Sequence, residues 1–324
     1  MRILLIKTSS LGDVVHNLPV VTDLRRHFPT ARIDWVVEEA FADIPRLHPG
    51  VNEVIPVAMR RWRRGLTSQA TRNEFGALRK RLRSARYNLA IDTQGLIKSA
   101  LITHLAQARR CGYAWRSARE PLASRFYDER HAVSRELHAV ERNRRLAALC
   151  AGYAVDGPPD YGIAIAGTPA TLAGTGDGPD TSGSPYAVLL TATSRDDKLW
   201  PESSWVALGL ALRARGIASR LPAGTPSELQ RAQRIAAQIP DAAALAPSRL
   251  GDLAYRIAGA ALVVGVDTGL VHLGAAMGRP TLALFAASDP ALTGVLASTP
   301  TVNLGARGQP PSVDAATAAV GELL

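Results

Sequence analysis

The sequence predicts an α/β protein made of two consecutive doubly wound parallel sheets. Short apolar runs alternate with helical patterning in both halves of the chain, and a stretch rich in Gly, Pro, Ser, Thr and Asp separates the halves within residues 157–185. The length of 324 residues is sufficient for two hydrophobic cores. We therefore expect one domain over residues 1–165 and a second over 166–324, with the ligand site in a cleft between them at the carboxyl ends of the strands.

The first half begins with an apolar run that is typical of a buried parallel strand. Strands are predicted over residues 2–7, 33–37, 54–57, 89–92 and 109–113. Helical spacing begins at Val14, and further helices are expected over 70–86, 97–107 and 138–149. Residues 116–134 show neither pattern and are predicted to be irregular.

The second half repeats the alternation. Strands are predicted over residues 186–190, 218–221, 261–266 and 281–285. Helices are predicted over 205–215, 226–238, 250–260, 270–277 and 313–324. The last of these helices could pack on either domain.

Composition indicates a globular protein of the cytoplasm. Hydrophobic residues make up 47% and charged residues 20% of the chain, no apolar run is long enough for a membrane helix, and no signal-peptide pattern is present. The two cysteines, Cys111 and Cys150, are expected to be small buried side chains in a reducing compartment rather than a disulfide framework. No His/Cys cluster occurs at ligand spacing, so no transition metal is expected.

The positive charge is concentrated in the first half of the chain. Residues 1–160 hold 27 Lys/Arg against 16 Asp/Glu, whereas residues 161–324 hold 11 against 12. Four arginines surround a tryptophan at Arg60-Arg61-Trp62-Arg63-Arg64, and more follow over 70–86. Such runs are usually solvated surface, but the asymmetry also fits an anionic partner for the first half: nucleic acid, an acidic substrate or an anionic membrane.

A small polar loop, Ser9-Ser10-Leu11-Gly12-Asp13, joins the first strand to the first helix. It matches neither the Walker A nor the GxGxxG pattern. An aspartate at a helix start caps free backbone N–H groups and suits the helix dipole, so Asp13 can be a cap as well as a functional carboxylate.

Three further motifs in the second half follow predicted strands. Thr193, Ser194 and Lys198 offer two hydroxyls and a cation suited to a diphosphate. Thr225-Pro226-Ser227-Glu228 has the form of a capping box, although Glu228 could instead bind ribose hydroxyls. Asp267-Thr268-Gly269 opens a helix whose N-terminus is an anion site, and His272, one turn inside, is either structural or a ligand contact.

Taken together, these segments resemble the lipopolysaccharide heptosyltransferases of glycosyltransferase family 9, type I in particular. The resemblance spans nearly the whole chain and rests on motifs that are weak singly and specific jointly. They are Lys7-Thr8-Ser9-Ser10-Leu11-Gly12-Asp13-Val14, Trp35-Val36-Val37-Glu38-Glu39, Val54-Ile55-Pro56-Val57 with Arg60-Arg61-Trp62-Arg63, Asp92-Thr93-Gln94-Gly95-Leu96, Arg119-Glu120-Pro121-Leu122-Ala123-Ser124, Arg195-Asp196-Asp197-Lys198 with Trp200-Pro201-Glu202, and Asp267-Thr268-Gly269-Leu270 with His272-Leu273.

The resemblance implies a GT-B fold, two Rossmann-like domains facing each other across a cleft. It implies inverting transfer of L-glycero-D-manno-heptose from ADP-heptose to Kdo of Kdo2-lipid A, without a metal or cofactor, at the cytoplasmic face of the inner membrane. The expected partners are ADP-heptose, Kdo2-lipid A and an anionic membrane surface, with no nucleic acid. The first domain would bind the acceptor and the second the donor.

The resemblance also implies roles for individual residues. Asp13 would be the catalytic base. The donor would be bound by Thr193, Ser194, Lys198, Glu228, Ser248, Asp267, Thr268, Gly269 and His272. The acceptor would be bound by Ser10, Gly12, Arg60, Arg61, Arg63, Arg64 and Arg119.

Two positions depart from the family pattern. Ser248 stands where close relatives place a methionine against the adenine, and Phe285-Ala286-Ala287-Ser288-Asp289-Pro290 lacks the glycine usual in its turn. The rival interpretations are heptosyltransferase II or another GT-B nucleotide-sugar transferase, and a non-catalytic basic module that binds nucleic acid or membrane.

Overall fold

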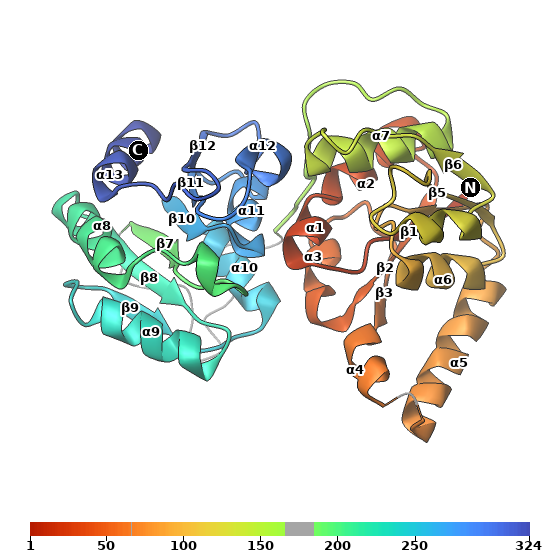
Figure 1. Ribbon diagram of the computed structural model, residues 1–324, viewed down its shortest axis with the longest axis horizontal. Helices are drawn as coiled ribbons and strands as arrows, with labels where there is room; N and C mark the ends of the chain where they lie inside the picture. The colour runs from red at the N-terminus through yellow and green to blue at the C-terminus, as the bar shows by residue number, and fades with distance from the viewer. Residues whose placement is uncertain (66, 166–184) are drawn as a thin grey trace. The chain divides into compact units, whose positions relative to one another are not determined.

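The computed structural model describes residues 1–65, 67–165 and 185–324. The chain forms two compact units, Met1–Ala164 and Ile165–Leu324. Each unit contains one six-stranded sheet in which neighbouring strands run parallel (Figure 1). The predicted fold class, two doubly wound parallel sheets surrounded by helices, is therefore confirmed.

The first sheet has the strand order β3-β2-β1-β4-β5-β6. Its strands are β1 (Arg2–Ile6), β2 (Arg32–Glu38), β3 (Glu53–Val57), β4 (Leu89–Asp92), β5 (Arg109–Tyr113) and β6 (Glu129–His131). The helices are α1 (Leu11–Val15), α2 (Leu18–His27), α3 (Asp43–Arg46), α4 (Met59–Arg64), α5 (Gln69–Ser84), α6 (Ile97–Leu105) and α7 (Ala139–Ala151), with short 3-10 turns η1 (Glu39–Phe41) and η2 (Pro121–Phe126).

The second sheet has the order β12-β11-β10-β7-β8-β9. In both sheets the strand order along the chain reverses at the centre of the sheet, between β1 and β4 in the first and between β7 and β10 in the second. Its strands are β7 (Tyr186–Leu190), β8 (Ala218–Pro222), β9 (Ala243–Leu245), β10 (Leu262–Val266), β11 (Thr281–Leu284) and β12 (Thr301–Leu304). The helices are α8 (Glu202–Ala214), α9 (Pro226–Ala236), α10 (Leu250–Ala258), α11 (Gly269–Ala276), α12 (Pro290–Thr293) and α13 (Val313–Leu323), with a 3-10 turn η4 (Asp196–Lys198).

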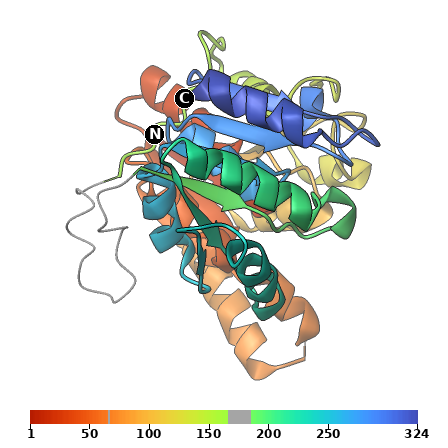
Figure 2. The same cartoon turned by 90° about the vertical axis from the view of Figure 1, so that its left-hand side faces the viewer.

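Both sheets are covered by helices on each face, which explains the continuous apolar runs of their central strands. In the first unit, Leu4 and Ile6 of β1 pack into a cluster with Leu82 of α5 and Ile102 of α6. In the second unit, the final helix α13 packs on its own sheet beside α8 (Figure 2). Val320 of α13 joins a cluster that includes residues of α8.

The three strands that the sequence did not predict, β6, β9 and β12, are all edge strands. Each has only three or four residues and none is fully buried. Edge strands are short and contact only one neighbour, so they lack the apolar run that marks a central strand. The arginine-rich stretch after β3, for which no element was predicted, forms helix α4.

The expectation that the two cysteines are unpaired is wrong. Cys111 of β5 and Cys150 of α7 are joined by a disulfide whose Cα atoms lie 5.8 Å apart, and both side chains are buried. The pairing was not apparent in the sequence because the cysteines are 39 positions apart. The sequence also has no His/Cys cluster at ligand spacing, but in the fold a ring nitrogen of His131 and the two sulfur atoms all lie within 4.8 Å of one another.

Candidate active site

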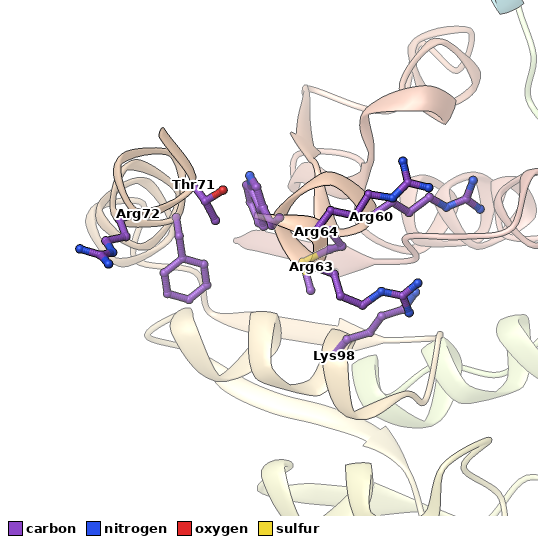
Figure 3. Close-up of a pocket in the computed structure, with 9 residues that line it drawn as sticks. Arg60, Arg63, Arg64, Thr71, Arg72 and Lys98 are labelled. Carbon is purple, nitrogen blue, oxygen red and sulfur yellow. The ribbon is translucent and has the colours of Figure 1, made fainter. Parts of the chain in front are cut away.

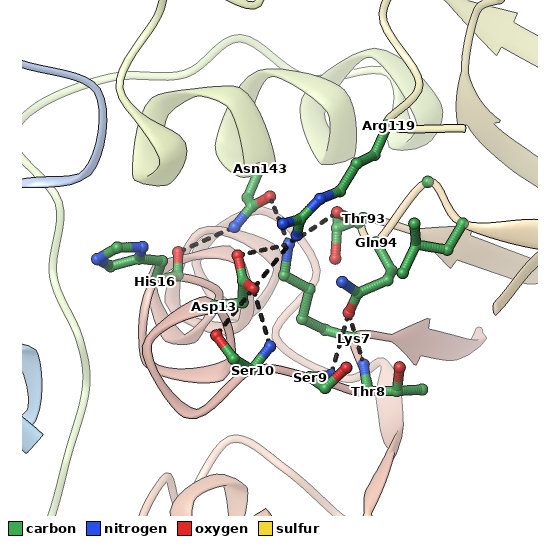
Figure 4. A network of polar contacts seen from close by, with 12 residues as sticks. Lys7, Thr8, Ser9, Ser10, Asp13, His16, Thr93, Gln94, Arg119 and Asn143 are labelled. Atoms are coloured by element: carbon green, nitrogen blue, oxygen red, sulfur yellow. Dashed lines mark hydrogen bonds and ion pairs between the residues drawn. The ribbon is translucent and has the colours of Figure 1, made fainter. Parts of the chain in front are cut away.

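The first cluster of polar side chains lies at the centre of the first sheet, where β1 and β4 are neighbours and the strand order reverses. The loops after two such strands diverge and leave a crevice suited to a ligand. Here the side-chain oxygen of Gln94, after β4, accepts hydrogen bonds from the backbone N–H groups of Thr8 (3.0 Å) and Ser9 (3.1 Å), after β1 (Figure 4). The two loops are therefore joined directly.

The loop after β4 is shaped by a buried carboxylate and a glycine. Asp92 accepts hydrogen bonds from the backbone N–H groups of Gln94 (2.8 Å) and Gly95 (3.2 Å) and from the hydroxyl of Tyr127 (2.7 Å). Burial raises the pKa of Asp92, which these hydrogen bonds partly oppose. Gly95 has a φ of +67°, and a Cβ there would lie 3.3 Å from the backbone nitrogen of Arg119. The glycine thus brings the Arg119 segment close to this loop.

Asp13 lies in the first turn of α1, after the N-cap residue Ser10. Its Oδ2 accepts hydrogen bonds from the backbone N–H (2.8 Å) and the hydroxyl (3.1 Å) of Ser10. This is the carboxylate half of a capping box, so the capping role is confirmed. The Asp13 side chain is nevertheless 26% exposed, which leaves it accessible to a ligand. Ser10 and Gly12, predicted acceptor contacts, lie in the same short segment.

Two cations flank the Asp13 carboxylate. Lys7 Nζ is 4.0 Å from Oδ1, and Arg119 Nη1 is 3.7 Å from Oδ2. Lys7 is buried, and its Nζ donates hydrogen bonds to the carbonyl oxygen of Thr93 (2.9 Å) and the side-chain oxygen of Asn143 (3.4 Å). Burial lowers the pKa of Lys7, although the Asp13 and Asp92 charges act in the opposite direction. Sequence reasoning assigned no role to Lys7, Gln94 or Asn143; the only signal was a lysine that ends an apolar strand.

Three arginines of α4, Arg60, Arg63 and Arg64, line a cavity of about 670 Å³ between α4 and α5 (Figure 3). Its apolar walls include Trp62 and Phe75, whose rings lie edge to face with their centroids 6.2 Å apart. Its cationic lining consists of Arg60, Arg63, Arg64, Arg72 and Lys98. An apolar cavity surrounded by cations suits a ligand that is both anionic and lipidic.

Arg61 differs from its neighbours. It forms ion pairs with Glu74 (2.9 Å) and Glu39 (3.2 Å), so its charge is compensated within the protein. The sequence predicted it as an equal member of the acceptor-binding arginines. Arg61 and Arg63 are two residues apart and therefore project from different sides of α4.

The second cluster lies at the corresponding position of the second sheet, where β7 and β10 are neighbours and the order reverses. Lys198, in the segment after β7, donates a hydrogen bond from Nζ to Oδ2 of Asp267, after β10, at 2.6 Å. The Thr193 hydroxyl donates to the backbone carbonyl oxygen of Asp267 at 3.2 Å. The structure therefore brings together three of the predicted donor residues, while Ser194 is exposed in the same loop.

Asp267 is the centre of this cluster. Besides Lys198, its carboxylate accepts a hydrogen bond from the hydroxyl of Ser288 and lies 3.9 Å from Nε2 of buried His272. Burial alone would raise the pKa of Asp267, but interactions with His272, Lys198 and Ser288 together hold that pKa well below its ordinary value. The carboxylate is therefore a fixed negative charge at neutral pH.

Helix α11 begins directly after Asp267, with Thr268 as its N-cap residue and Gly269 as its first residue. The first N–H groups of a helix have no partner within the helix and favour an anion. The cluster thus combines a helix N-terminus with the Lys198 ammonium group, an arrangement that suits a diphosphate.

The structure gives Glu228 the capping geometry. Its backbone N–H donates to the hydroxyl of Thr225 (3.2 Å), and its carboxylate accepts from the backbone N–H of Gly224 (2.7 Å). Ser248 is exposed in the loop between β9 and α10. Neither observation tests the predicted contacts with the nucleoside.

The turn after β11, which lacks the family's glycine, needs no left-handed backbone at Ala286 or Ala287, since neither has a positive φ. Ser288 in this turn supplies the hydroxyl that binds Asp267. Asp289 caps α12 by accepting from the N–H of Ala291 at 2.8 Å. The departure from the family pattern therefore leaves the turn compatible with the Asp267 cluster.

Comparison with known proteins shows the family to which the chain belongs. The model of the family described as glycosyltransferase family 9 (heptosyltransferase) matches residues 75–320. Lipopolysaccharide heptosyltransferase 1 of Escherichia coli K12 is 44% identical over 299 residues, which cover 91% of this chain and 90% of that protein.

Two solved structures are similar along essentially the whole chain. E. coli heptosyltransferase WaaC with ADP has a TM-score of 0.89 and 40% identity, with 100% of both chains covered. E. coli WaaC with ADP-2-deoxy-2-fluoro heptose has a TM-score of 0.84 and 41% identity, with 99% and 98% covered. The protein is thus a glycosyltransferase with a GT-B-like fold, and the chain belongs to glycosyltransferase family 9, the heptosyltransferases.

Proposed function

We propose that this protein transfers L-glycero-D-manno-heptose from ADP-heptose to a Kdo sugar of Kdo2-lipid A during lipopolysaccharide biosynthesis, with inversion at the anomeric carbon. The similarity to a lipopolysaccharide heptosyltransferase 1 and to a heptosyltransferase that binds ADP and an ADP-heptose analogue supports the reaction class. The observation that carries the proposal is that each unit gathers a distinct polar cluster at its own strand-order reversal: a carboxylate beside cations in the first and a diphosphate-type site in the second.

The donor diphosphate would bind at Lys198 and the N-terminus of α11. The Asp267 carboxylate accepts a hydrogen bond from Lys198 Nζ, which keeps the ammonium group oriented toward this site. As the glycosidic bond breaks, negative charge grows on the leaving ADP. Lys198 and the helix N-terminus are positive groups fixed in advance, so the proposed mechanism needs no metal ion or cofactor.

Asp13 would act as the general base. An acceptor hydroxyl attacks the anomeric carbon from the face opposite the diphosphate while the Asp13 carboxylate accepts its proton. Lys7 and Arg119 each place a cationic nitrogen within 4.0 Å of the Asp13 carboxylate, and this attraction holds the carboxylate in position. Lys7 is a positioning residue in this scheme, and Arg119 lies where it can also contact an anionic acceptor.

The acceptor would use the cationic cavity between α4 and α5. Kdo2-lipid A carries carboxylates, phosphates and acyl chains, which match the arginine lining and the Trp62–Phe75 wall. The same face would contact the anionic cytoplasmic surface of the inner membrane. Among the described residues, no helix has both the length and the apolar character needed to cross a bilayer.

A transfer assay with two acceptors tests the proposal. The purified protein is incubated with ADP-heptose and either Kdo2-lipid A or an acceptor that already carries one heptose, and products are identified by mass. We expect one heptose to be added to Kdo2-lipid A. Product from the heptosylated acceptor alone would instead indicate heptosyltransferase II, and no product from either would reject heptosyl transfer.

The distant alternative is a basic nucleic-acid-binding module without catalysis. It requires affinity for nucleic acid that falls steeply with salt, because counterions are released on binding. We expect no such binding at physiological salt. Tight, salt-sensitive binding together with undiminished function of Asp13→Asn would favour the alternative.

Arg63→Glu is expected to raise the KM for Kdo2-lipid A by about tenfold or more, since a charge-assisted contact becomes a repulsion, and to leave the KM for ADP-heptose unchanged. Arg61→Glu should have a smaller effect, because Arg61 is already paired with Glu39 and Glu74. Arg83→Glu, an exposed site on α5, is the matched control. Steady-state kinetics with each substrate varied in turn measure these effects; a rise confined to the donor KM would contradict the acceptor assignment.

Lys7→Met is expected to lower kcat/KM for transfer by about tenfold or more, because methionine fills a similar volume but removes the cation that lies 4.0 Å from the Asp13 carboxylate. Lys80→Met, at an exposed lysine of α5, is the control and should leave kcat/KM unchanged. Unchanged kcat/KM in Lys7→Met, measured beside an unchanged thermal unfolding temperature, would contradict the positioning role of Lys7.

A further inference from the structure

A group of three metal-ligating side chains, two of them buried and one partly exposed, lies in the first unit, on the face of the sheet that α7 covers. Cys111 and Tyr113 alternate along β5 and so point to the same face, and Arg142 of α7 lies over the Tyr113 ring at 5.0 Å. His131 of β6 is in register with Tyr113 and therefore points to this face as well. Cys150 belongs to α7 itself. Three separate elements thus converge on one point.

The three ligand atoms are close enough to share one cation. A ring nitrogen of His131 and the two sulfur atoms all lie within 4.8 Å of one another. Zinc–sulfur bonds of about 2.3 Å and zinc–nitrogen bonds of about 2.0–2.1 Å require ligand atoms to lie on the order of 4 Å apart. Only small side-chain movements separate the observed arrangement from such a site.

The His131 imidazole gives independent support for a cation site. Nε2 of His131 is buried and has no hydrogen-bond partner among the described residues, and Oε2 of Glu129 lies 3.9 Å from it. That carboxylate is itself held by two hydrogen bonds from Arg109, at 2.8 and 2.9 Å. A buried ring nitrogen without a partner carries a desolvation cost that a bound cation would remove.

We propose that Cys111, Cys150 and His131 form a binding site for a soft cation of the Zn²⁺ or Cu⁺ class when the disulfide is reduced. A dithiol reductant transfers two electrons and two protons to the Cys111–Cys150 bond, giving two thiols and an oxidised dithiol. A divalent cation then binds both sulfurs as thiolates and the neutral imidazole, and two protons are released to solvent. Disulfide and metal-bound forms exclude each other, so the site couples cation binding to redox state.

Neither form involves the groups assigned to heptosyl transfer, so the inference does not depend on the proposed function. Thiolate and imidazole ligands select zinc and copper over magnesium or calcium, which prefer oxygen ligands. With three protein ligands, a fourth position remains for water or another small ligand.

The test is metal binding by the whole chain in its two redox states. Protein reduced with a phosphine is freed of reductant without air and dialysed against Zn²⁺, and Co²⁺ is added in parallel to reveal thiolate-to-cobalt charge-transfer absorption. We expect one equivalent per reduced chain, two protons released per Zn²⁺, and no binding by the oxidised chain. Reduced protein that binds no cation, or oxidised protein that binds equally well, would overturn the proposal.

Variants identify the ligands. Cys150→Ser should abolish the charge-transfer absorption, and His131→Gln should weaken Zn²⁺ binding by about tenfold or more, as loss of a ligand does at least as much as loss of an outer-shell partner. His104→Gln, at an exposed histidine of α6, is the control and should bind normally. Because Cys150→Ser could fail to fold, His131→Gln on the half-exposed edge strand β6 is the decisive variant. Unchanged affinity in His131→Gln, with unchanged cobalt absorption, would overturn the assignment.

Discussion

Asp13→Asn is expected to lower kcat by about 10²–10⁴-fold, the range that general base catalysis contributes, while ADP-heptose still binds. Asparagine is nearly isosteric with aspartate, and its side-chain oxygen can still accept the hydrogen bonds from Ser10 that the carboxylate accepts now. The substitution therefore removes the proton acceptor and retains the helix cap. Turnover and donor affinity measured on the same preparation separate the two roles.

Two controls complete this experiment. Asp43→Asn changes another helix-start carboxylate in the first unit, which pairs with Arg46 at 2.8 Å, and should leave turnover unchanged. The thermal unfolding temperature of Asp13→Asn should stay close to that of the unsubstituted protein. Near-normal turnover in Asp13→Asn would show that Asp13 is only a cap.

Lys198→Met is expected to have the second large effect, a fall in kcat of about 10²–10³-fold with a higher KM for ADP-heptose, as for removal of one fixed group that stabilises a developing charge. The substitution removes the cation assigned to the diphosphate. It also leaves the buried Asp267 carboxylate without its 2.6 Å partner. Arg195→Met is the matched control, because Arg195 lies in the same loop but is paired with Asp197 at the surface. Equal losses in the two variants, measured by steady-state kinetics with ADP-heptose varied, would contradict the role of Lys198.

The lowered pKa of Asp267 determines the pH range in which the contacts of its carboxylate are lost. Its pKa in the folded protein is held below the ordinary value, so its stabilising contacts are fully present above about pH 4 and are lost as pH falls through the lowered pKa. An acid limb of activity at higher pH therefore cannot arise from Asp267.

Most of the fold was predictable from the sequence because buried central strands leave a strong local pattern. The run Arg2–Ile6 is apolar after its first residue, and its last four residues are fully buried. The edge strands were missed because a segment such as Glu129–His131 has no apolar pattern and is defined only by its neighbour. The sequence pattern within one segment does not show which distant segment that strand pairs with.

The residues of the candidate site were likewise predictable only in part. Motif spacing located the loop residues Asp13, Lys198 and Asp267, since each follows an apolar strand. It did not reveal that Lys7 approaches Asp13, or that Cys111 meets Cys150 across 39 residues, because those contacts depend on how α7 and the loops pack. Packing, rather than residue type, also separates Arg61 from Arg63.

The proposed roles of Lys198 and Asp13 are tested together by a structure of the protein with a non-transferable ADP-heptose analogue and an acceptor fragment that carries Kdo. We expect the diphosphate to lie against Lys198 and the N-terminus of α11, and the attacked Kdo hydroxyl to lie within hydrogen-bond distance of the Asp13 carboxylate. A diphosphate bound away from Lys198 and residues 267–272, or a hydroxyl whose only neighbouring base is a group other than Asp13, would contradict these roles.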